Sequence, residues 1–329
     1  MRALTSLQPE PSGRGCQTEP SGRGPTSVPV GVWLQAARLK FLPQGVFPVA
    51  IAGTAAVAAD VFNPIYFIIA LLAAAAVQVG LTMFNDTLDF QYGTDKGKLN
   101  TKNPFSGGSG VLTSGCIRPK QAMTVIVGLY VFALLCAIYF AFATGIESLY
   151  IAGIGAFVSI AYSAKPFRLA YRGLGELAML FGYGPVLTAW AYYIHAGTVT
   201  TDIILTGIIP GLCMWTMILI NEIPDYAEDR AAGKKNLTYR LTPKGSKNLF
   251  IASLIVIYVY IAVLVVTGIL PPFASLAFLG VPLAVVAAQT AHREFADPLK
   301  IAKANKYMVL IYSLTNAAIA IAFLAARSP

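Results

Sequence analysis

Residues 64–89 read PIYFIIALLAAAAVQVGLTMFNDTLD, an apolar stretch that ends in amide and carboxylate side chains. The apolar part is long enough to cross a lipid bilayer as one helix, which takes about 20 residues. A helix is expected because backbone groups in lipid must find their hydrogen-bond partners within the segment. Asn85, Asp86 and Asp89 lie at its end, and ionisable groups in a membrane helix are functional by default. The stretch therefore predicts a membrane span with a polar site at one edge.

The composition extends this prediction to the rest of the chain. Of the 329 residues, 56% are hydrophobic and only 12% are charged, whereas a soluble domain carries about a quarter charged residues. Apolar stretches of roughly the length of a span lie near 41–59, 64–88, 121–143, 148–164, 174–195, 201–223, 248–270, 273–291 and 305–326. We therefore expect an all-α membrane protein with nine transmembrane helices in a single bundle.

The beginning of the chain differs from the rest. Residues 10–15 (EPSGRG) recur as residues 19–24, and the segment is rich in Pro, Gly and Ser without an apolar stretch. Such a composition cannot bury enough apolar surface to fold, and it also lacks the apolar core of a signal peptide. We expect residues 1–31 to be a disordered N-terminal extension and residues 32–329 to form the helical domain.

The basic residues predict the orientation of the bundle. Every Lys and Arg except Arg327 lies before residue 41 or in the connections 89–120, 165–173, 224–247 and 292–306. The connections between these carry Asp60, Glu147 and Asp202 and no basic residue. Nine spans place all the basic segments on one side, which the positive-inside rule makes cytoplasmic. The N-terminus is then cytoplasmic and the C-terminus lies outside.

The acidic end of the 64–88 stretch is repeated later in the chain. Residues 85–90 (NDTLDF) are matched by residues 221–226 (NEIPDY), and Gly-Lys pairs follow at 97–98 and 233–234. Each copy lies at the cytoplasmic end of an expected helix, the second and the sixth. The site is therefore expected on the cytoplasmic face.

Helical spacing groups the polar residues of each copy. Asn85 and Asp89 share a face, while Asn221, Asp225 and Asp229 follow one another at every fourth residue. A proline at position 224 is expected to interrupt this second row.

The residue types in the two clusters indicate a divalent metal site. Carboxylate and amide oxygens suit Mg²⁺ or Ca²⁺, and Mg²⁺ usually completes its shell with water and substrate phosphate. Facing clusters would hold a diphosphate through bridging metal ions. The candidate metal ligands are Asp86, Asp89, Asp95, Asp225 and Asp229. Lys96, Lys98 and Lys234 could bind outer phosphate oxygens, although they could also be solvated loop charges.

Residues 103–115 read NPFSGGSGVLTSG and follow the first cluster. Glycine allows close approach of the backbone to a ligand, and successive backbone amides can bind anions. The segment lacks the phosphate-binding P-loop pattern. We expect a lid over the site, with a simple connector as the alternative.

At these residues the sequence resembles the UbiA superfamily of intramembrane prenyltransferases, which implies nine helices and aspartate-rich motifs on the second and sixth. The family's first motif is commonly NDxxDxxxD, but here Gly93 takes the last position and Asp95 follows. That variant resembles the branch that prenylates 1,4-dihydroxy-2-naphthoate in menaquinone biosynthesis. Asp225 and Asp229 match the second motif, DxxxD. Segments 33–43, 162–169 and 171–176 also resemble the family, although Leu39 and Phe41 replace its usual Pro and Thr.

The resemblance implies transfer of a prenyl group from an isoprenyl diphosphate to an aromatic acceptor, with Mg²⁺ as cofactor. The catalytic groups would be Asp86, Asp89, Asp225 and Asp229, which hold the metal and diphosphate, and Tyr162, whose ring can stabilise an allylic cation. Arg38 could orient the carboxylate or phenolate of the acceptor. Asn85 and Asn221 are further substrate-binding candidates. Lys165 and Arg168 could bind diphosphate or lipid phosphates.

Several alternatives fit the same residues. The acceptor could be homogentisate, hydroxybenzoate, chlorophyllide, haem or a glyceryl phosphate lipid, and a terpene cyclase needs the same metal site. A transporter is a distant alternative, because the repeated clusters run in one direction and lie at one membrane face, unlike inverted repeats around a midplane site. The lipid bilayer and two small substrates are the expected partners, and no nucleic acid is expected.

Overall fold

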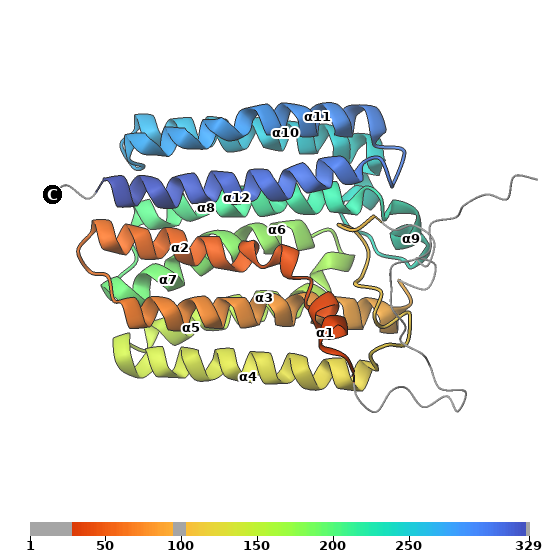
Figure 1. The fold of residues 1–329 in the computed structure, drawn as a ribbon, viewed down its shortest axis with the longest axis horizontal. Helices are drawn as coiled ribbons and strands as arrows, with labels where there is room; N and C mark the ends of the chain where they lie inside the picture. Colours follow the sequence, from red (N-terminus) through yellow and green to blue (C-terminus); the bar gives the residue numbers. More distant parts are fainter. Residues whose placement is uncertain (1–27, 95–102, 327–329) are drawn as a thin grey trace, which may run out of the picture.

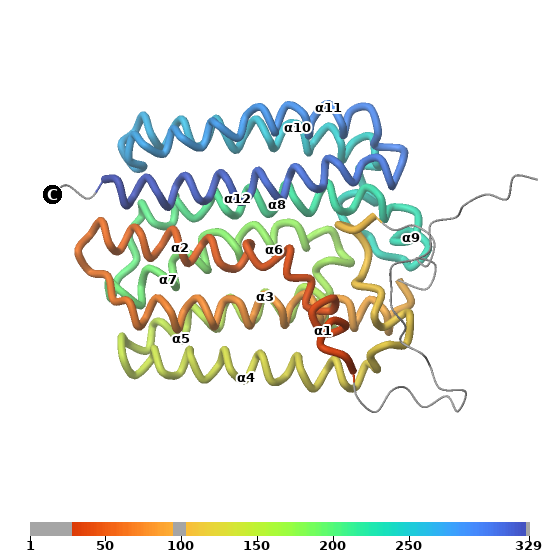
Figure 2. The backbone as a smooth tube through the Cα atoms, viewed as in Figure 1, coloured from red at the N-terminus to blue at the C-terminus, as the bar shows by residue number. Residues whose placement is uncertain are grey.

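The computed structural model describes residues 28–94 and 103–326, and every regular element among them is helical (Figure 1). The elements are α1 (Val30–Ala37), η1 (Leu39–Phe41), α2 (Pro43–Ala58), α3 (Pro64–Tyr92), α4 (Pro119–Thr144), α5 (Glu147–Ser163), η2 (Leu169–Tyr171), α6 (Gly175–Phe181), η3 (Gly182–Val186), α7 (Leu187–Ala196), α8 (Thr201–Glu222), α9 (Tyr226–Ala231), α10 (Leu237–Val266), η4 (Pro272–Gly280), α11 (Val281–Glu294) and α12 (Ala302–Ala325). The long helices run side by side along one direction, so that the connections gather at the two ends of the bundle (Figure 2).

The membrane-spanning character of the bundle is confirmed, but the number of spans is not. Within the described residues, seven helical segments are long and apolar enough to cross a membrane. An eighth is added if the pair Val30–Phe41 and Pro43–Ala58, bent by 52°, forms one broken span. α5, with 17 residues, is apolar but shorter. Each of the expected stretches falls on helix, and the count of nine spans stays a prediction.

The first helix begins slightly before the expected domain boundary. α1 starts at Val30, within the segment that was expected to lack structure, whereas residues 1–27 lie outside the described residues. α1 ends at Arg38, which adopts a left-handed backbone conformation (φ 45°) and turns the chain into η1 and α2. This bend is absent from the hydropathy pattern because an apolar average does not register a change of direction.

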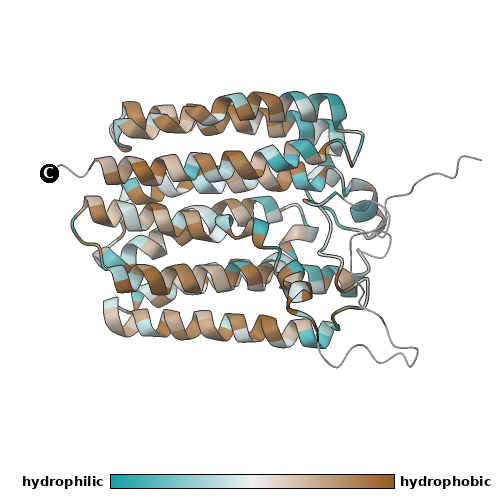
Figure 3. Ribbon diagram, viewed as in Figure 1, coloured by the Kyte–Doolittle hydropathy of each residue, from teal (hydrophilic) through white to brown (hydrophobic). Residues whose placement is uncertain are grey.

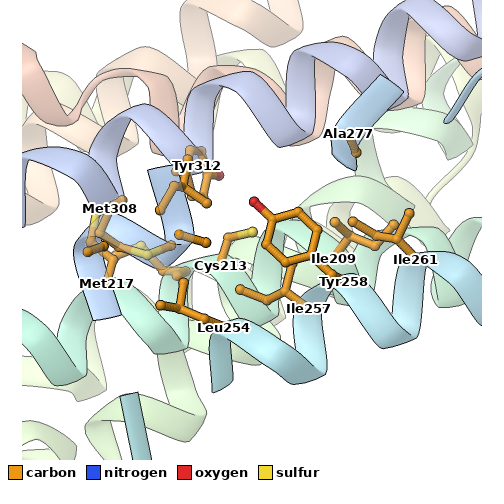
Figure 4. Close-up of a cluster of buried hydrophobic side chains, with 14 of the residues drawn as sticks. Ile209, Cys213, Met217, Leu254, Ile257, Tyr258, Ile261, Ala277, Met308 and Tyr312 are labelled. Atoms are coloured by element: carbon orange, nitrogen blue, oxygen red, sulfur yellow. The ribbon is translucent and has the colours of Figure 1, made fainter. Parts of the chain in front are cut away.

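α8 lies at the centre of the bundle. Its most apolar window is 72% buried, compared with 22% for α4 at the periphery. Close contacts join α8 to α10, α12 and the α6–η3 segment. Figure 4 shows the core beside it, built from Ile209, Cys213, Met217, Leu254, Ile257, Tyr258, Ile261, Ala277, Met308 and Tyr312. Packing of this kind holds fixed the helix that carries the second acidic cluster.

Glycines allow α6 and η3 to approach α8 very closely. A Cβ atom on Gly211 would lie 2.4 Å from the carbonyl oxygen of Leu180, and one on Gly184 would lie 2.7 Å from that of Gly207. Small residues at such contacts let helix backbones meet in a membrane, where close packing replaces the hydrophobic effect. The break at η3, where Gly184 leaves helical geometry, lies at this contact.

We expect Gly211→Ala to destabilise the bundle by about 3 kcal/mol, because the added methyl group meets backbone rather than a mobile side chain. The measurement is thermal unfolding of the purified protein in detergent. Gly128→Ala in α4 is the matched control, since a Cβ there meets nothing within 4 Å. Equal melting temperatures for the two variants would contradict this account of the contact.

One end of the bundle is polar. Hydrophilic residues gather where α9 and the connections after α3 and α8 lie, whereas the C-terminus lies at the opposite end (Figure 3). α1 begins near the polar end, so the described chain starts and finishes at opposite ends of the bundle (Figure 1). The assignment of the polar end to the cytoplasm stays a prediction from the charge distribution.

Candidate active site

The first acidic cluster lies in the last turns of α3. Asp86 and Asp89 are 5% and 7% exposed, so both carboxylates are buried at the polar end of a membrane helix. Asn85 donates to the hydroxyl of Ser163 at 3.0 Å and thereby ties α3 to the end of α5. α3 stops at Gly93, whose φ of 82° is favourable only for glycine.

The second cluster spans a break between two helices. α8 ends at Glu222, Pro224 follows, and α9 begins after Asp225. Proline cannot donate the hydrogen bond that the carbonyl of Ile220 would otherwise receive. Asn305 of α12 donates to that carbonyl at 2.9 Å and to the side-chain oxygen of Asn221 at 2.7 Å. The row of Asn221, Asp225 and Asp229 is therefore interrupted at Pro224, as the sequence predicts, and the buried Asn305 stabilises the break.

Both clusters line one cavity of about 160 Å³ at the polar end. The predicted site residues in its wall are Arg38, Asn85, Asp86, Asp89, Tyr162, Asn221, Asp225, Asp229 and Lys234. Residues 105–108 of the predicted lid segment also line it. The remaining wall residues are ones that the sequence pattern did not single out for the site: Phe41, Gln44, Gln78, Leu81, Thr82, Met179, Tyr183, Met214, Ile218 and Glu222. The structure thus brings residues from distant helices into one polar chamber.

Lys234 joins the two clusters. Its ammonium lies 3.7 Å from a carboxylate oxygen of Asp89 and 3.6 Å from one of Asp229. Burial lowers the pKa of Lys234, but the Asp229 and Asp89 carboxylates outweigh this and raise it well above its ordinary value. Lys234 is therefore a permanent cation inside an acidic chamber. Asn236 donates at 2.9 Å to the same carboxylate oxygen of Asp229 and helps to fix its position.

Tyr171 positions Asp89 from outside the chamber. Its hydroxyl donates to Asp89 at 2.5 Å and lies 2.8 Å from the hydroxyl of Thr94. Burial, together with the negative charge of Asp89, raises the pKa of Tyr171, so the phenol stays protonated as a donor. Arg168 stacks on the Tyr171 ring at 3.8 Å and on the Tyr92 ring at 4.0 Å. These contacts hold the Asp89 carboxylate in one orientation.

The segment 103–115 lies across both clusters. The backbone amide of Gly107 donates to Asp225 at 2.8 Å, and that of Ser109 donates to Asp86 at 2.7 Å. Asn103 anchors the start of this segment, because its side chain donates to Asn305 at 3.2 Å. The lid position predicted from the glycine-rich sequence agrees with these contacts.

Arg38 enters the chamber from the left-handed turn after α1. Its guanidinium lies 3.5 Å from a carboxylate oxygen of Asp86 and packs over the ring of Phe41 at 4.7 Å. The same side chain donates to the carbonyl of Phe105 at 3.5 Å, so it also contacts the lid segment. A fixed, planar cation beside the clusters suits recognition of a carboxylate or phenolate.

Other predicted site residues do not reach the cavity wall. Lys165 is exposed, and its ammonium nitrogen lies 5.9 Å from the centre of the Tyr92 ring. Arg168 packs on Tyr171, which in turn donates to Asp89. Asp95, Lys96 and Lys98 fall in 95–102, outside the described residues.

An apolar groove of about 190 Å³ adjoins the polar chamber. Gln78, Leu81, Met179 and Tyr183 line both spaces, so the two meet at this point. Beyond it the groove is walled almost entirely by small and aliphatic side chains of α3, α4, α5 and the α6–η3–α7 segment. The combined space fits a molecule with an anionic head and a long apolar tail.

Comparison with known proteins gives a family match over most of the chain. A family model described as the UbiA prenyltransferase family matches residues 46–314. The chain is 27% identical over 221 residues to a 1,4-dihydroxy-2-naphthoate octaprenyltransferase of Bacillus subtilis, covering 67% of this chain and 69% of that protein. It is 28% identical over 273 residues to the Escherichia coli protein of the same name, covering 81% and 86%.

The fold is also similar to a solved structure. A UbiA homologue from Archaeoglobus fulgidus bound to DMAPP and Mg²⁺ aligns with a TM-score of 0.60 at 14% identity. The alignment covers 89% of this chain and 99% of that one. At this level of identity the likeness concerns the fold.

Proposed function

This chain belongs to the UbiA prenyltransferase family, and we propose that it transfers a prenyl group from an isoprenyl diphosphate to 1,4-dihydroxy-2-naphthoate. Family membership makes it a prenyltransferase. The proposal concerns its substrates, its metal and the residues that act on them. It places the reaction in the synthesis of a lipid quinone.

The observation that carries the proposal is the junction of an acidic chamber with an apolar groove. A diphosphate cannot bind beside buried carboxylates unless cations neutralise the repulsion between them. The apolar groove leads away from the same point and accepts a hydrocarbon chain. An isoprenyl diphosphate with its metal ions has the matching distribution of charge and apolar surface.

The donor set fits Mg²⁺. The chamber offers carboxylate oxygens from Asp86, Asp89, Asp225 and Asp229 and amide oxygens from Asn85 and Asn221. Among the described residues, no group of three or more His, Cys, Asp or Glu side chains converges on one point. Such a cation would therefore share its shell with water and substrate phosphate, as Mg²⁺ usually does. When bound, Mg²⁺ neutralises the diphosphate and makes it a better leaving group.

The protein side chains supply the remaining steps. Lys234 offers a fixed positive charge to the departing diphosphate from between the clusters. The ring of Tyr162 lines the chamber, where its face can stabilise positive charge on the allylic carbon. Arg38 orients the acceptor by binding the acceptor's carboxylate. A carbon of the electron-rich ring then bonds to the allylic carbon, whose C–O bond to diphosphate breaks, and the ring regains its aromaticity by losing a proton or CO2. The lid segment limits the access of water to the cation.

The choice of naphthoate rests on the relatives and on the first motif. The B. subtilis and E. coli relatives are named for this acceptor. The first motif has Gly93 where the commoner family motif has its last aspartate, and Asp95 follows. This variant of the motif resembles the naphthoate branch. The other acceptors considered above are alternative outcomes of the same assay.

The test is product formation by the purified protein from isoprenyl diphosphates of several lengths and a panel of aromatic acceptors. We expect prenylated naphthoate, identified by mass spectrometry, and loss of product when EDTA removes divalent metal. Product with homogentisate or hydroxybenzoate alone would overturn the acceptor assignment. Formation of a cyclised hydrocarbon without any acceptor would identify a terpene cyclase instead.

A further inference from the structure

Two buried amide side chains form the floor of the polar chamber. Gln44 of α2 and Gln78 of α3 are 5% and 3% exposed, and both line the cavity. The rise of an α-helix, about 1.5 Å per residue, places Gln78 about 12 Å below Asp86 along α3. Polar groups at this depth in a membrane protein are costly and mark functional positions or helix contacts.

Both polar atoms of the Gln78 side chain have hydrogen-bond partners. Its side-chain oxygen accepts from the hydroxyl of Tyr183, and its nitrogen donates to Thr82 at 3.3 Å and to the side-chain oxygen of Gln44 at 3.4 Å. These partners lock the Gln78 side chain in place, so it serves to orient Gln44.

The amide nitrogen of Gln44 has only a weak acceptor among the described residues. Within the described part of the chain, its amide nitrogen reaches only the thioether sulfur of Met217, 2.8 Å away. Sulfur in methionine is a weak acceptor, so a buried donor here lacks a full hydrogen bond. Exchanging the nitrogen and oxygen positions of the amide would still leave one polar atom facing sulfur.

The backbone around Gln44 is fixed by a side chain from another helix. Pro48 lies one turn further along α2 and has no amide to donate to the carbonyl of Gln44. The hydroxyl of Tyr312 takes its place, donating to that carbonyl at 2.9 Å. Tyr312 and Met217 belong to the same buried cluster (Figure 4). Gln44 is thus held rigidly, which a recognition group requires.

The chamber floor has two sides. Gln78, Leu81, Met179 and Tyr183 lead into the apolar groove, where the proposed function places the donor chain. Gln44, with Met214 and Ile218 of α8, lines the chamber but not the groove. Arg38 likewise lines the chamber but not the groove, so both side chains border the space left for an acceptor.

We propose that the side-chain amide of Gln44 donates a hydrogen bond to an oxygen substituent on the ring of the aromatic acceptor. This is the oxygen that lies farthest from the acceptor's carboxylate. This specificity determinant rests on the proposed function, in which Arg38 binds the carboxylate. For 1,4-dihydroxy-2-naphthoate the oxygen is the 4-hydroxyl group. Gln44 therefore selects acceptors that carry a second oxygen across the ring, and an acceptor without it leaves the buried amide unpaired.

The test compares binding of 1,4-dihydroxy-2-naphthoate with that of 1-hydroxy-2-naphthoate, which lacks this oxygen. Dissociation constants are measured by calorimetry with Mg²⁺ and a thiolodiphosphate analogue of the donor, so that ring reactivity does not affect the result. We expect Gln44→Leu to weaken binding of the dihydroxy compound by about 10- to 100-fold. Binding of the monohydroxy compound should change by less than about twofold.

Controls separate this role from a structural one. Gln91→Leu, an exposed position of α3 outside the cavity, should leave both constants unchanged. The donor analogue should bind Gln44→Leu as it binds the wild type, which shows that the chamber has formed. Equal effects of Gln44→Leu on both compounds, or none on either, would overturn the role of Gln44 while naphthoate transfer continued. Failure of the wild type to bind or prenylate naphthoate would overturn the acceptor assignment itself.

Discussion

Replacing Asp89 or Asp225 with asparagine is expected to lower prenyl transfer by about a thousandfold or more. Each substitution keeps the shape of the side chain and removes one negative charge from the chamber. A metal-bound diphosphate then loses a ligand, and stabilisation of leaving-group charge by bound metal is worth several kcal/mol, with about 1.4 kcal/mol for each factor of ten. Asp89→Asn also leaves Lys234 with one fewer carboxylate beside it.

The measurement is the rate of product formation at saturating donor, repeated over a Mg²⁺ titration. We expect the asparagine variants to need more Mg²⁺ for half-maximal activity as well as to turn over slowly. Asp202→Asn is the matched control. Asp202 is exposed in the first turn of α8, whereas Asp225 follows the last turn of the same helix. The metal-site assignment would be wrong if Asp89→Asn and Asp225→Asn kept activities within about threefold of that control.

The sequence predicted the site as far as local spacing reaches. The acidic clusters fall at the ends of apolar stretches, so their place at one end of α3 and α8 follows from helix geometry. Arg38, Tyr162 and Lys234 came from the resemblance or from their closeness to a cluster. The structure places all three in the wall of the same cavity.

The contacts that residues make across the fold could not be predicted from local spacing. Asn305 of α12 reaches the break in α8 from a distant part of the chain, and Tyr171 reaches Asp89 from a short connection. Gln44 and Gln78 are polar residues inside apolar stretches, which is a usable signal, but it does not reveal that they meet. The bend between α1 and α2 depends on the backbone at Arg38, which hydropathy does not register.

Filling the apolar groove should change which donors are accepted. A Cβ atom on Gly155 of α5 would lie 3.7 Å from Val186, and both residues line the groove. The space around Gly155 therefore admits a side chain that projects toward the groove. At the helical rise, Gly155 lies about 12 Å along α5 from Ser163, the residue that contacts the first acidic cluster. A leucine there would block a long donor chain beyond its first units.

We expect Gly155→Leu to lower kcat/KM for octaprenyl diphosphate by about a hundredfold or more, because the blocked chain must leave its apolar site. Geranyl diphosphate, whose chain ends before the obstruction, should keep its rate within about threefold. Such a difference between the two donors in the change of kcat/KM cannot arise from damage to the metal site, since both donors carry the same diphosphate. The assay measures product from each donor with the same acceptor.

Gly128→Leu provides the control for this experiment. Gly128 lies on the exposed surface of α4, has open space around it and lines neither cavity. Its leucine variant carries the same added bulk and should treat both donors as the wild type does. Equal loss of both donors in Gly155→Leu would indicate distortion of the chamber. Unchanged use of octaprenyl diphosphate would mean that the donor chain leaves the chamber by another route. The groove would then not be the binding site of the donor chain.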